Sequence, residues 1–131
     1  MSIDTIGDFL TIIRNGVLAS KRQVVAPYSL IKHQVAQILQ GEGFIKGVIV
    51  KGDTPQEKHL VIDLKYVDGE SVIHEITRVS KPGRRIYKSA EQVKPVIGGL
   101  GIAILTTPRG VVSHKKAQQI SVGGEVICTV W

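Results

Sequence analysis

Apolar residues in the first forty positions recur at the spacing of amphipathic helices. One set, with the i, i+3, i+4, i+7 pattern, comprises Ile6, Phe9, Leu10, Ile13 and Val17. It predicts a helix with one buried face, and Asp4 is placed to cap its first turn. A second set, which follows the potential cap Ser29, comprises Ile31, Val35, Ile38 and Leu39. It predicts a second helix that ends at Gly41 or Gly43.

Between and after these helices the pattern changes to that of strands. Residues 24–25 predict a short strand that ends at Pro27. Residues 44–52 are apolar and β-branched, residues 53–58 form a polar turn, and residues 59–66 alternate between apolar and polar side chains. The alternating residues that would share one face are Leu60, Ile62, Leu64 and Tyr66. The first half therefore predicts helix, strand, helix, strand, strand.

The second half of the chain predicts mostly strands. The expected strands are residues 72–79, 84–88, 102–105 and 125–131. Short helical stretches are expected at 89–94 and at 113–120, the second capped by the serine at its start. A type II turn is expected with Pro82 and Gly83 at its centre, and a flexible loop at 97–101.

A polar turn at residues 67–70 marks the boundary between the two halves. The sequence predicts an α+β fold of two small domains. Residues 1–68 form an N-terminal α/β domain, and residues 69–131 form a C-terminal, mainly β domain with one or two short helices.

Composition narrows the class of protein. Hydrophobic residues make up 43% of the chain and aromatic residues 5%, so the core must be aliphatic. No apolar run approaches the roughly 20 residues that span a bilayer, and the first ten residues carry two acids where a targeting peptide carries bases. We therefore expect a soluble intracellular protein without a membrane partner. The single cysteine, Cys128, lies in an apolar stretch and is expected to be buried in a strand.

Charge is unevenly distributed along the chain. The net charge is +6, yet residues 1–77 hold eight bases and nine acids. Residues 78–116 hold nine bases and one acid, Glu91. The excess therefore lies in one segment, which favours an anionic partner such as a nucleic acid.

The usual catalytic and metal-binding motifs are not found in the sequence. The four histidines have no second ligand at metal spacing, and there is no CxxC, GxSxG or GxxxxGK[ST]. Gly98, Gly99 and Gly101 fail the GxGxxG spacing and precede a predicted strand. We expect no cofactor and no metal. An enzyme acting on an anionic substrate in a cleft between the halves, with His74 or a perturbed carboxylate, stays an open alternative.

Some residues of the basic segment suit RNA. Tyr87 lies between Arg85 and Lys88 on a short predicted strand, where an aromatic ring beside cations can hold an unstacked base. Lys115 and Lys116 fall in the first turn of a predicted helix, where positive charge opposes the helix dipole unless an anion lies nearby. A solvated charged face and a structural tyrosine are the alternatives. The sequence does not say whether Arg85 or its neighbour Arg84 would face RNA.

The predicted hairpin tip IAILTTPRGVV carries more chemistry than a turn requires. Pro108 and Gly110 suit the second and fourth positions of a type I turn. Thr106, Thr107 and Arg109 are not demanded by it. Two hydroxyls beside a guanidinium suit a sugar, a base edge and a phosphate at close range.

Several motifs carry a resemblance to a known family. In chain order they are IGDFLTIIRNG, EGFI, RVSKPGRRIYK, GLGIAIL, TTPRGVV and GGEVICTVW. Over essentially the whole chain the sequence resembles the ribosomal protein S8 family of the small subunit, in its bacterial form. The resemblance implies a non-enzymatic protein that binds an irregular stem in the central domain of small-subunit (16S-type) ribosomal RNA early in assembly.

The resemblance also implies particular RNA contacts. In that family a turn of a hydroxyl residue, Thr, Ser, Lys and Gly enters the RNA minor groove near unpaired bases. Thr106, Thr107 and Gly110 match it, and Arg109 replaces the lysine with retention of charge. Pro108 departs from the pattern because it lacks both the serine hydroxyl and an amide hydrogen.

Other matched positions are spread along the chain. They are Arg14 and Asn15, Ser29 and Lys32, Tyr87 and Lys88, and Gly123, Gly124 and Glu125. Leu30 lies close to where relatives often carry lysine, which would weaken the contact before the second helix. The resemblance implies a cytoplasmic, ribosome-bound protein, or one of an organellar ribosome, with neighbouring small-subunit proteins as partners. A translational regulator that binds its own messenger RNA through the same surface stays open as an alternative.

Overall fold

The computed structural model describes residues 4–94, 96 and 99–131. Its contacts divide the chain into two compact units. One unit comprises residues 8–73, and the other combines the described residues of 74–131 with residues 4–7. We call them the 8–73 unit and the 74–131 unit. The α+β class is confirmed, whereas the domain boundary at residues 68 and 69 stays a prediction.

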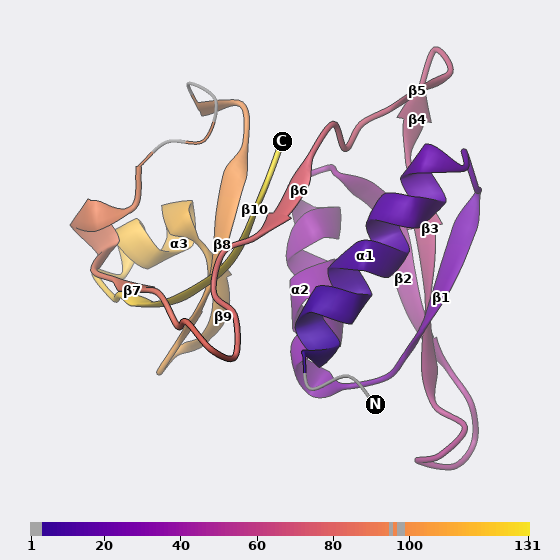
Figure 1. Ribbon diagram of the computed structural model, residues 1–131, viewed down its shortest axis with the longest axis horizontal. Coiled ribbons are helices and arrows are strands. Elements are labelled where there is room, and N and C mark those ends of the chain that lie inside the picture. The colour runs from indigo at the N-terminus through magenta and orange to yellow at the C-terminus, as the bar shows by residue number, and fades with distance from the viewer. Residues whose placement is uncertain (1–3, 95, 97–98) are drawn as a thin grey trace. The chain divides into compact units, whose positions relative to one another are not determined.

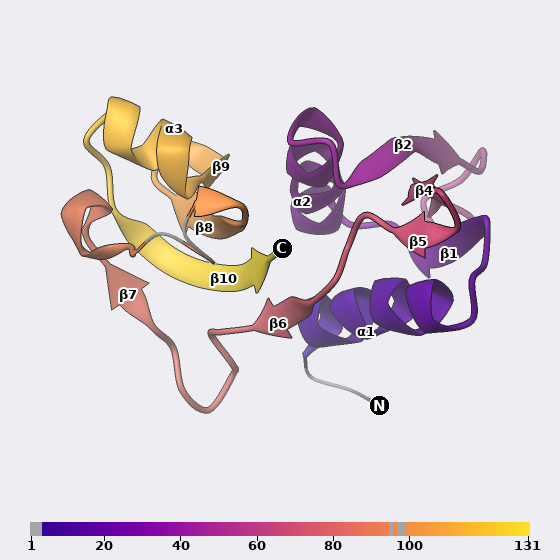
Figure 2. The same ribbon diagram turned by 90° about the horizontal axis from the view of Figure 1, so that it is seen from above.

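The 8–73 unit contains two helices against a three-stranded antiparallel sheet (Figures 1 and 2). Its main elements are α1 (Thr5–Leu18), β1 (Gln23–Pro27), α2 (Leu30–Gly41), β2 (Ile45–Lys51) and β3 (His59–Leu64). The strand order is β1-β3-β2. β4 (Tyr66–Val67) and β5 (Glu70–Ser71) form a separate two-stranded hairpin. The predicted order of elements is confirmed up to β3.

Both long helices begin at the predicted caps. The backbone N–H of Gly7 donates to Asp4 Oδ1 at 3.1 Å, and the N–H of Lys32 donates to Ser29 Oγ at 3.2 Å. A side-chain oxygen at this position satisfies an amide that has no partner within the helix. After α2, Gly43 takes a φ of +82°, a conformation that favours glycine and lets the chain turn into β2.

The predicted apolar faces form the core of the 8–73 unit. Its fully or almost fully buried residues include Phe9, Leu10, Ile13, Val35, Leu39, Leu60, Ile62 and Leu64. A methyl group at Gly16 would collide with the Val24 side chain. Glycine at this position therefore lets α1 lie close to β1.

The 74–131 unit is built around β10 (Gly124–Val130). Its other elements are β6 (Ile76–Arg78), β7 (Tyr87–Lys88), the 3-10 helix η1 (Ala90–Gln92), β8 (Ile102–Thr107), β9 (Gly110–Ser113) and α3 (His114–Gln119). One edge of β10 pairs with β7 near its start and with β6 near its end, and the other edge pairs with β8. β9 continues the sheet beyond β8, and all pairs are antiparallel. The expected burial of Cys128 is confirmed.

Local expectations for the 74–131 unit were partly wrong. A turn does form around Pro82 and Gly83, with Lys81 and Arg84 exchanging backbone hydrogen bonds of 3.0 and 2.9 Å. Gly83 has no positive φ, so the turn is not type II, because that type requires a positive φ at its third residue. In the predicted loop 97–101, residues 97 and 98 lie outside the described residues. No helix in the described part of the chain is long and apolar enough to cross a membrane.

Candidate nucleic-acid interface

The start of β10 brings several predicted residues together. Glu125 is paired with Tyr87 of β7 on one side and with Thr106 of β8 on the other. Directly opposed residues of antiparallel strands project from the same face of a sheet. Tyr87, Glu125 and Thr106 therefore form one row across three strands, which we call the β10 row. Tyr87 is 69% exposed.

Two glycines allow this convergence. A methyl group at Gly124 would collide with the carbonyl of Thr106, and one at Gly123 would lie 2.5 Å from the carbonyl oxygen of Lys88. The sequence predicted a turn at these glycines. Gly124 is instead the first residue of β10, and it pairs with Lys88. Their function is close approach of strands, because no side chain fits there.

An ion pair fixes the arginine beside the β10 row. Arg85 Nη1 donates to Glu125 Oε2 at 3.0 Å, with side chains 48% and 15% exposed. The pair places the Arg85 guanidinium against the β10 row, and a contact of Arg85 with RNA stays a prediction. The guanidinium still offers exposed donors, and the half-buried carboxylate keeps it in place.

The Thr107 hydroxyl stabilises the turn between β8 and β9 with two hydrogen bonds. Thr107 Oγ1 donates to the carbonyl of Gly110 at 2.8 Å and accepts from the Arg109 N–H at 3.1 Å. The expectation that the turn does not need Thr107 was therefore wrong. Thr106 has no such bond among the described contacts, and Arg109 is exposed. Gly110 takes a φ of +107°, which favours glycine.

The two lysines of α3 lie exposed in the same unit. The predicted cap is present, since the Lys116 N–H donates to Ser113 Oγ at 3.3 Å. α3 also carries the buried His114, whose Nδ1 accepts from the Ala103 N–H at 3.1 Å and ties the helix to β8. Lys115 and Lys116 lie on α3, whereas the β10 row is formed by β7, β8 and β10.

Arg78 belongs to the basic segment but faces the protein interior. Its guanidinium lies 3.2 Å from Asp4 Oδ1 and donates to the Ile127 carbonyl at 2.9 Å. Burial of Asp4 raises its pKa, but the hydrogen bonds from Arg78 and from the Gly7 N–H outweigh it, and the net pKa is lowered. Arg78 is therefore not part of a solvated charged face, which was the alternative interpretation of the basic segment.

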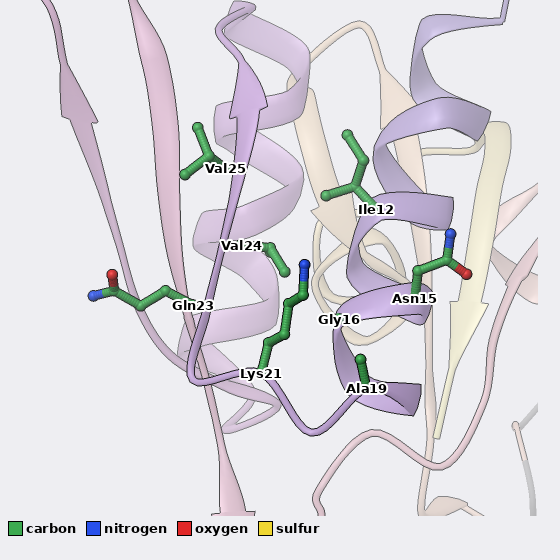
Figure 3. Close-up of a pocket in the computed structure, with 8 residues that line it drawn as sticks. All are labelled: Ile12, Asn15, Gly16, Ala19, Lys21, Gln23, Val24 and Val25. Carbon is green, nitrogen blue, oxygen red and sulfur yellow. The ribbon is translucent and has the colours of Figure 1, made fainter.

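The remaining predicted residues lie in the 8–73 unit, apart from the β10 row in the chain. Arg14 and Asn15 are on α1, half-buried and exposed respectively. Asn15 lines a hollow between α1 and β1 (Figure 3). The Ser29 hydroxyl caps α2. Lys32 is only 6% exposed, and its Nζ donates to the Pro27 carbonyl at 3.4 Å.

Sequence reasoning passed over Lys21, which lines the same hollow as Asn15. The charge count over residues 1–77 concealed it, because acids later in that range cancel the bases. A charge count over shorter segments would have shown a second basic region, because residues 9–41 contain no acid.

Comparisons with known proteins agree with the motifs. The family model described as ribosomal protein S8 matches residues 4–131. The protein named small ribosomal subunit protein uS8 from Rhodospirillum centenum is 49% identical over 128 residues, which cover 98% of this chain and 97% of the relative. Proteins of the same name from Rhizobium leguminosarum bv. trifolii and Stutzerimonas stutzeri are each 48% identical over the same shares.

Proposed function

Because this chain belongs to the ribosomal protein S8 family, we propose that it binds and stabilises a stem in the central domain of small-subunit ribosomal RNA during assembly. Family membership gives it a structural role in the small ribosomal subunit. The RNA stem, the contact residues and association with neighbouring ribosomal proteins are our proposal.

The β10 row is the observation that carries this proposal. It places an exposed aromatic ring, a carboxylate and a hydroxyl on one face, with the Arg85 guanidinium held against the carboxylate. An unstacked base can stack on Tyr87 while its edge meets Thr106 and Glu125, and Arg85 can meet a phosphate. A rigid row of this kind suits irregular RNA, whose bases are available for stacking.

The other candidates extend this contact. We assign phosphate or sugar contacts to exposed cations of the same unit, namely Lys88, Arg109, Lys115 and Lys116. Thr107 and Gly110 shape the tip that presents Arg109, and Gly123 and Gly124 let β10 approach β7 and β8 closely enough to form the β10 row. We assign a separate contact of the 8–73 unit to Arg14 and Asn15, while Ser29 and Lys32, whose polar groups bond within the protein, shape the start of α2.

A filter-binding titration with the central-domain stem and a random hairpin of equal length tests the proposal. The protein should prefer the stem, and its affinity should fall with salt in proportion to the phosphates neutralised. Thr106→Val should weaken stem binding by about 1–3 kcal/mol, because its hydroxyl is expected to meet a base edge. Thr77→Val, an exposed threonine of β6, is the matched control. Equal affinity for both RNAs would overturn the proposal.

Tyr87 separates stacking from hydrogen bonding. Tyr87→Phe keeps the ring and should retain most of the stem affinity. Tyr87→Leu removes it and should cost about 1–3 kcal/mol. If both variants bind like the parent protein, Tyr87 is not an RNA contact.

A further inference from the structure

A hollow of about 580 Å³ opens in the 8–73 unit between the second half of α1 and β1 (Figure 3). It is lined by Ile12, Asn15, Gly16, Ala19, Lys21, Gln23, Val24 and Val25. In Figure 3 the Lys21 side chain points into the space between the helix and the strand, whereas Gln23 points away from it. Ile12 and Val24 contribute apolar surface to the hollow, and the Lys21 ammonium group lies in the space between helix and strand.

The backbone beside the hollow is held by hydrogen bonds that do not use its charged side chains. The Tyr66 hydroxyl donates to the Lys21 carbonyl at 2.7 Å, and the Leu64 N–H donates to the Arg22 carbonyl at 3.0 Å. The N–H of Lys21 donates to the Gly16 carbonyl at 2.9 Å. These bonds fix the backbone of Lys21 and Arg22. Both side chains are exposed, and of the two residues Lys21 lines the hollow while Arg22 is its neighbour in the chain.

The stretch of chain that lines the hollow, residues 12–25, contains bases and no acid. Residues 9–41 contain no acid, and their bases are Arg14, Lys21, Arg22 and Lys32. The nearby acid Asp63 of β3 accepts a hydrogen bond from the Gln23 side-chain amide at 2.6 Å. Figure 3 shows that the Gln23 side chain points away from the hollow. Neither described salt bridge involves Lys21 or Arg22. An anionic ligand would supply the missing partner.

We propose that this hollow binds a second stretch of RNA backbone, distinct from the stem contacted by the 74–131 unit. Lys21 and Arg22 meet phosphates, Asn15 meets a sugar or base edge, and the apolar surface covers the face of a ribose or base. This inference rests on the proposed function. An apolar surface alone would suit a protein segment, but two cations without described acidic partners favour a polyanion.

The charge test uses the full chain with two RNAs, naked small-subunit ribosomal RNA and the isolated central-domain stem. Lys21→Gln combined with Arg22→Gln should weaken binding to the long RNA roughly threefold to tenfold and reduce its logarithmic salt slope by about 1.4. Binding to the isolated stem should not change. Lys46→Gln combined with Lys51→Gln makes the same charge change in β2 and should have no effect on either RNA.

A steric test keeps the charge constant. Ala19→Trp should fill the hollow and produce a similar loss on the long RNA, since Ala19 lines it. Leu18→Trp is the control, because Leu18 is 78% exposed and does not line the hollow. Thermal unfolding of each variant checks that the fold is kept.

The outcomes separate this inference from the proposed function. If the parent protein prefers the stem but the Lys21 and Arg22 variant binds the long RNA equally well, the hollow is not an RNA site and the stem contact stands. An equal loss with the β2 control, or an equal loss on the isolated stem, would also overturn the inference. If the parent protein shows no preference for the stem, the proposed function itself fails.

Discussion

At the scale of the residue, polar groups in this protein have either a structural or a surface role, and burial distinguishes them. Arg78 and Lys32 carry charges that the sequence counts as basic, yet both are bonded to the protein itself. Arg85 is different because its ion pair leaves it about half exposed. The ion pair of Arg85 thus positions a cation instead of removing it from the surface.

Cys128 allows a residue-scale prediction. Burial raises the pKa of its thiol to about 12, so the reactive thiolate is scarce at pH 8. Native protein should react with iodoacetamide far more slowly than protein in urea, as measured by mass spectrometry. An Ala19→Cys variant, exposed at the hollow, should label rapidly under the same native conditions. Rapid native labelling of Cys128 would contradict its burial in β10.

At the scale of the element, the site depends on how closely β10 approaches its neighbours. Gly124→Ala would force a methyl group against the Thr106 carbonyl, and we expect a loss of about 1–3 kcal/mol in the free energy of unfolding. Urea denaturation measures it. Gly83→Ala is the control, because no atom lies within 4 Å of the added methyl group and Gly83 has no positive φ. Equal stability of both variants would show that the strands can separate without cost.

Elements with local signals were predictable from the sequence. Asp4 and Ser29 cap their helices through contacts three residues away, and the helical apolar spacing is also local. The strand predicted over 59–66 was too long, because pairing of β3 ends at Leu64 and Tyr66 pairs with Ser71 instead. Alternation reports burial on one face but not the partner of a strand.

The site was predictable as a set of residues but not as an arrangement. Tyr87, Thr106 and Glu125 were all candidates, but their common row depends on the register of three strands. Register is set by tertiary pairing, and no short-range pattern encodes it. The Thr107 hydroxyl was misjudged for a related reason, since its bonds depend on the geometry of the closed hairpin.

At the scale of the whole molecule, an ion pair between Asp4 and Arg78 joins two distant parts of the sequence within the 74–131 unit. Asp4 both caps α1 and binds Arg78, 74 positions later in the chain. Its lowered pKa means that the folded state favours the carboxylate. This contribution to stability is present above the unfolded pKa, near 3.8, and is lost as pH falls through the lower folded value.

Asp4→Asn tests this linkage. We expect the free energy of unfolding near pH 7 to fall by about 1–3 kcal/mol, because a charged hydrogen bond is lost. The difference from the parent protein should shrink as pH falls below about 4. Urea denaturation across pH measures both effects, and Asp8→Asn, an exposed acid of α1, is the control. A difference that stays constant down to pH 2 would contradict the ion-pair account.

The central strand of the 74–131 unit is also the last strand of the chain. β10 supplies the partner edges for β6, β7 and β8, so none of these pairs can form before residues 124–130 are available. During synthesis, Tyr87 and Thr106 are added to the chain before Glu125. The β10 row therefore assembles only after translation has passed that point, and an interrupted chain that lacks β10 cannot compete with the finished protein for RNA through this row.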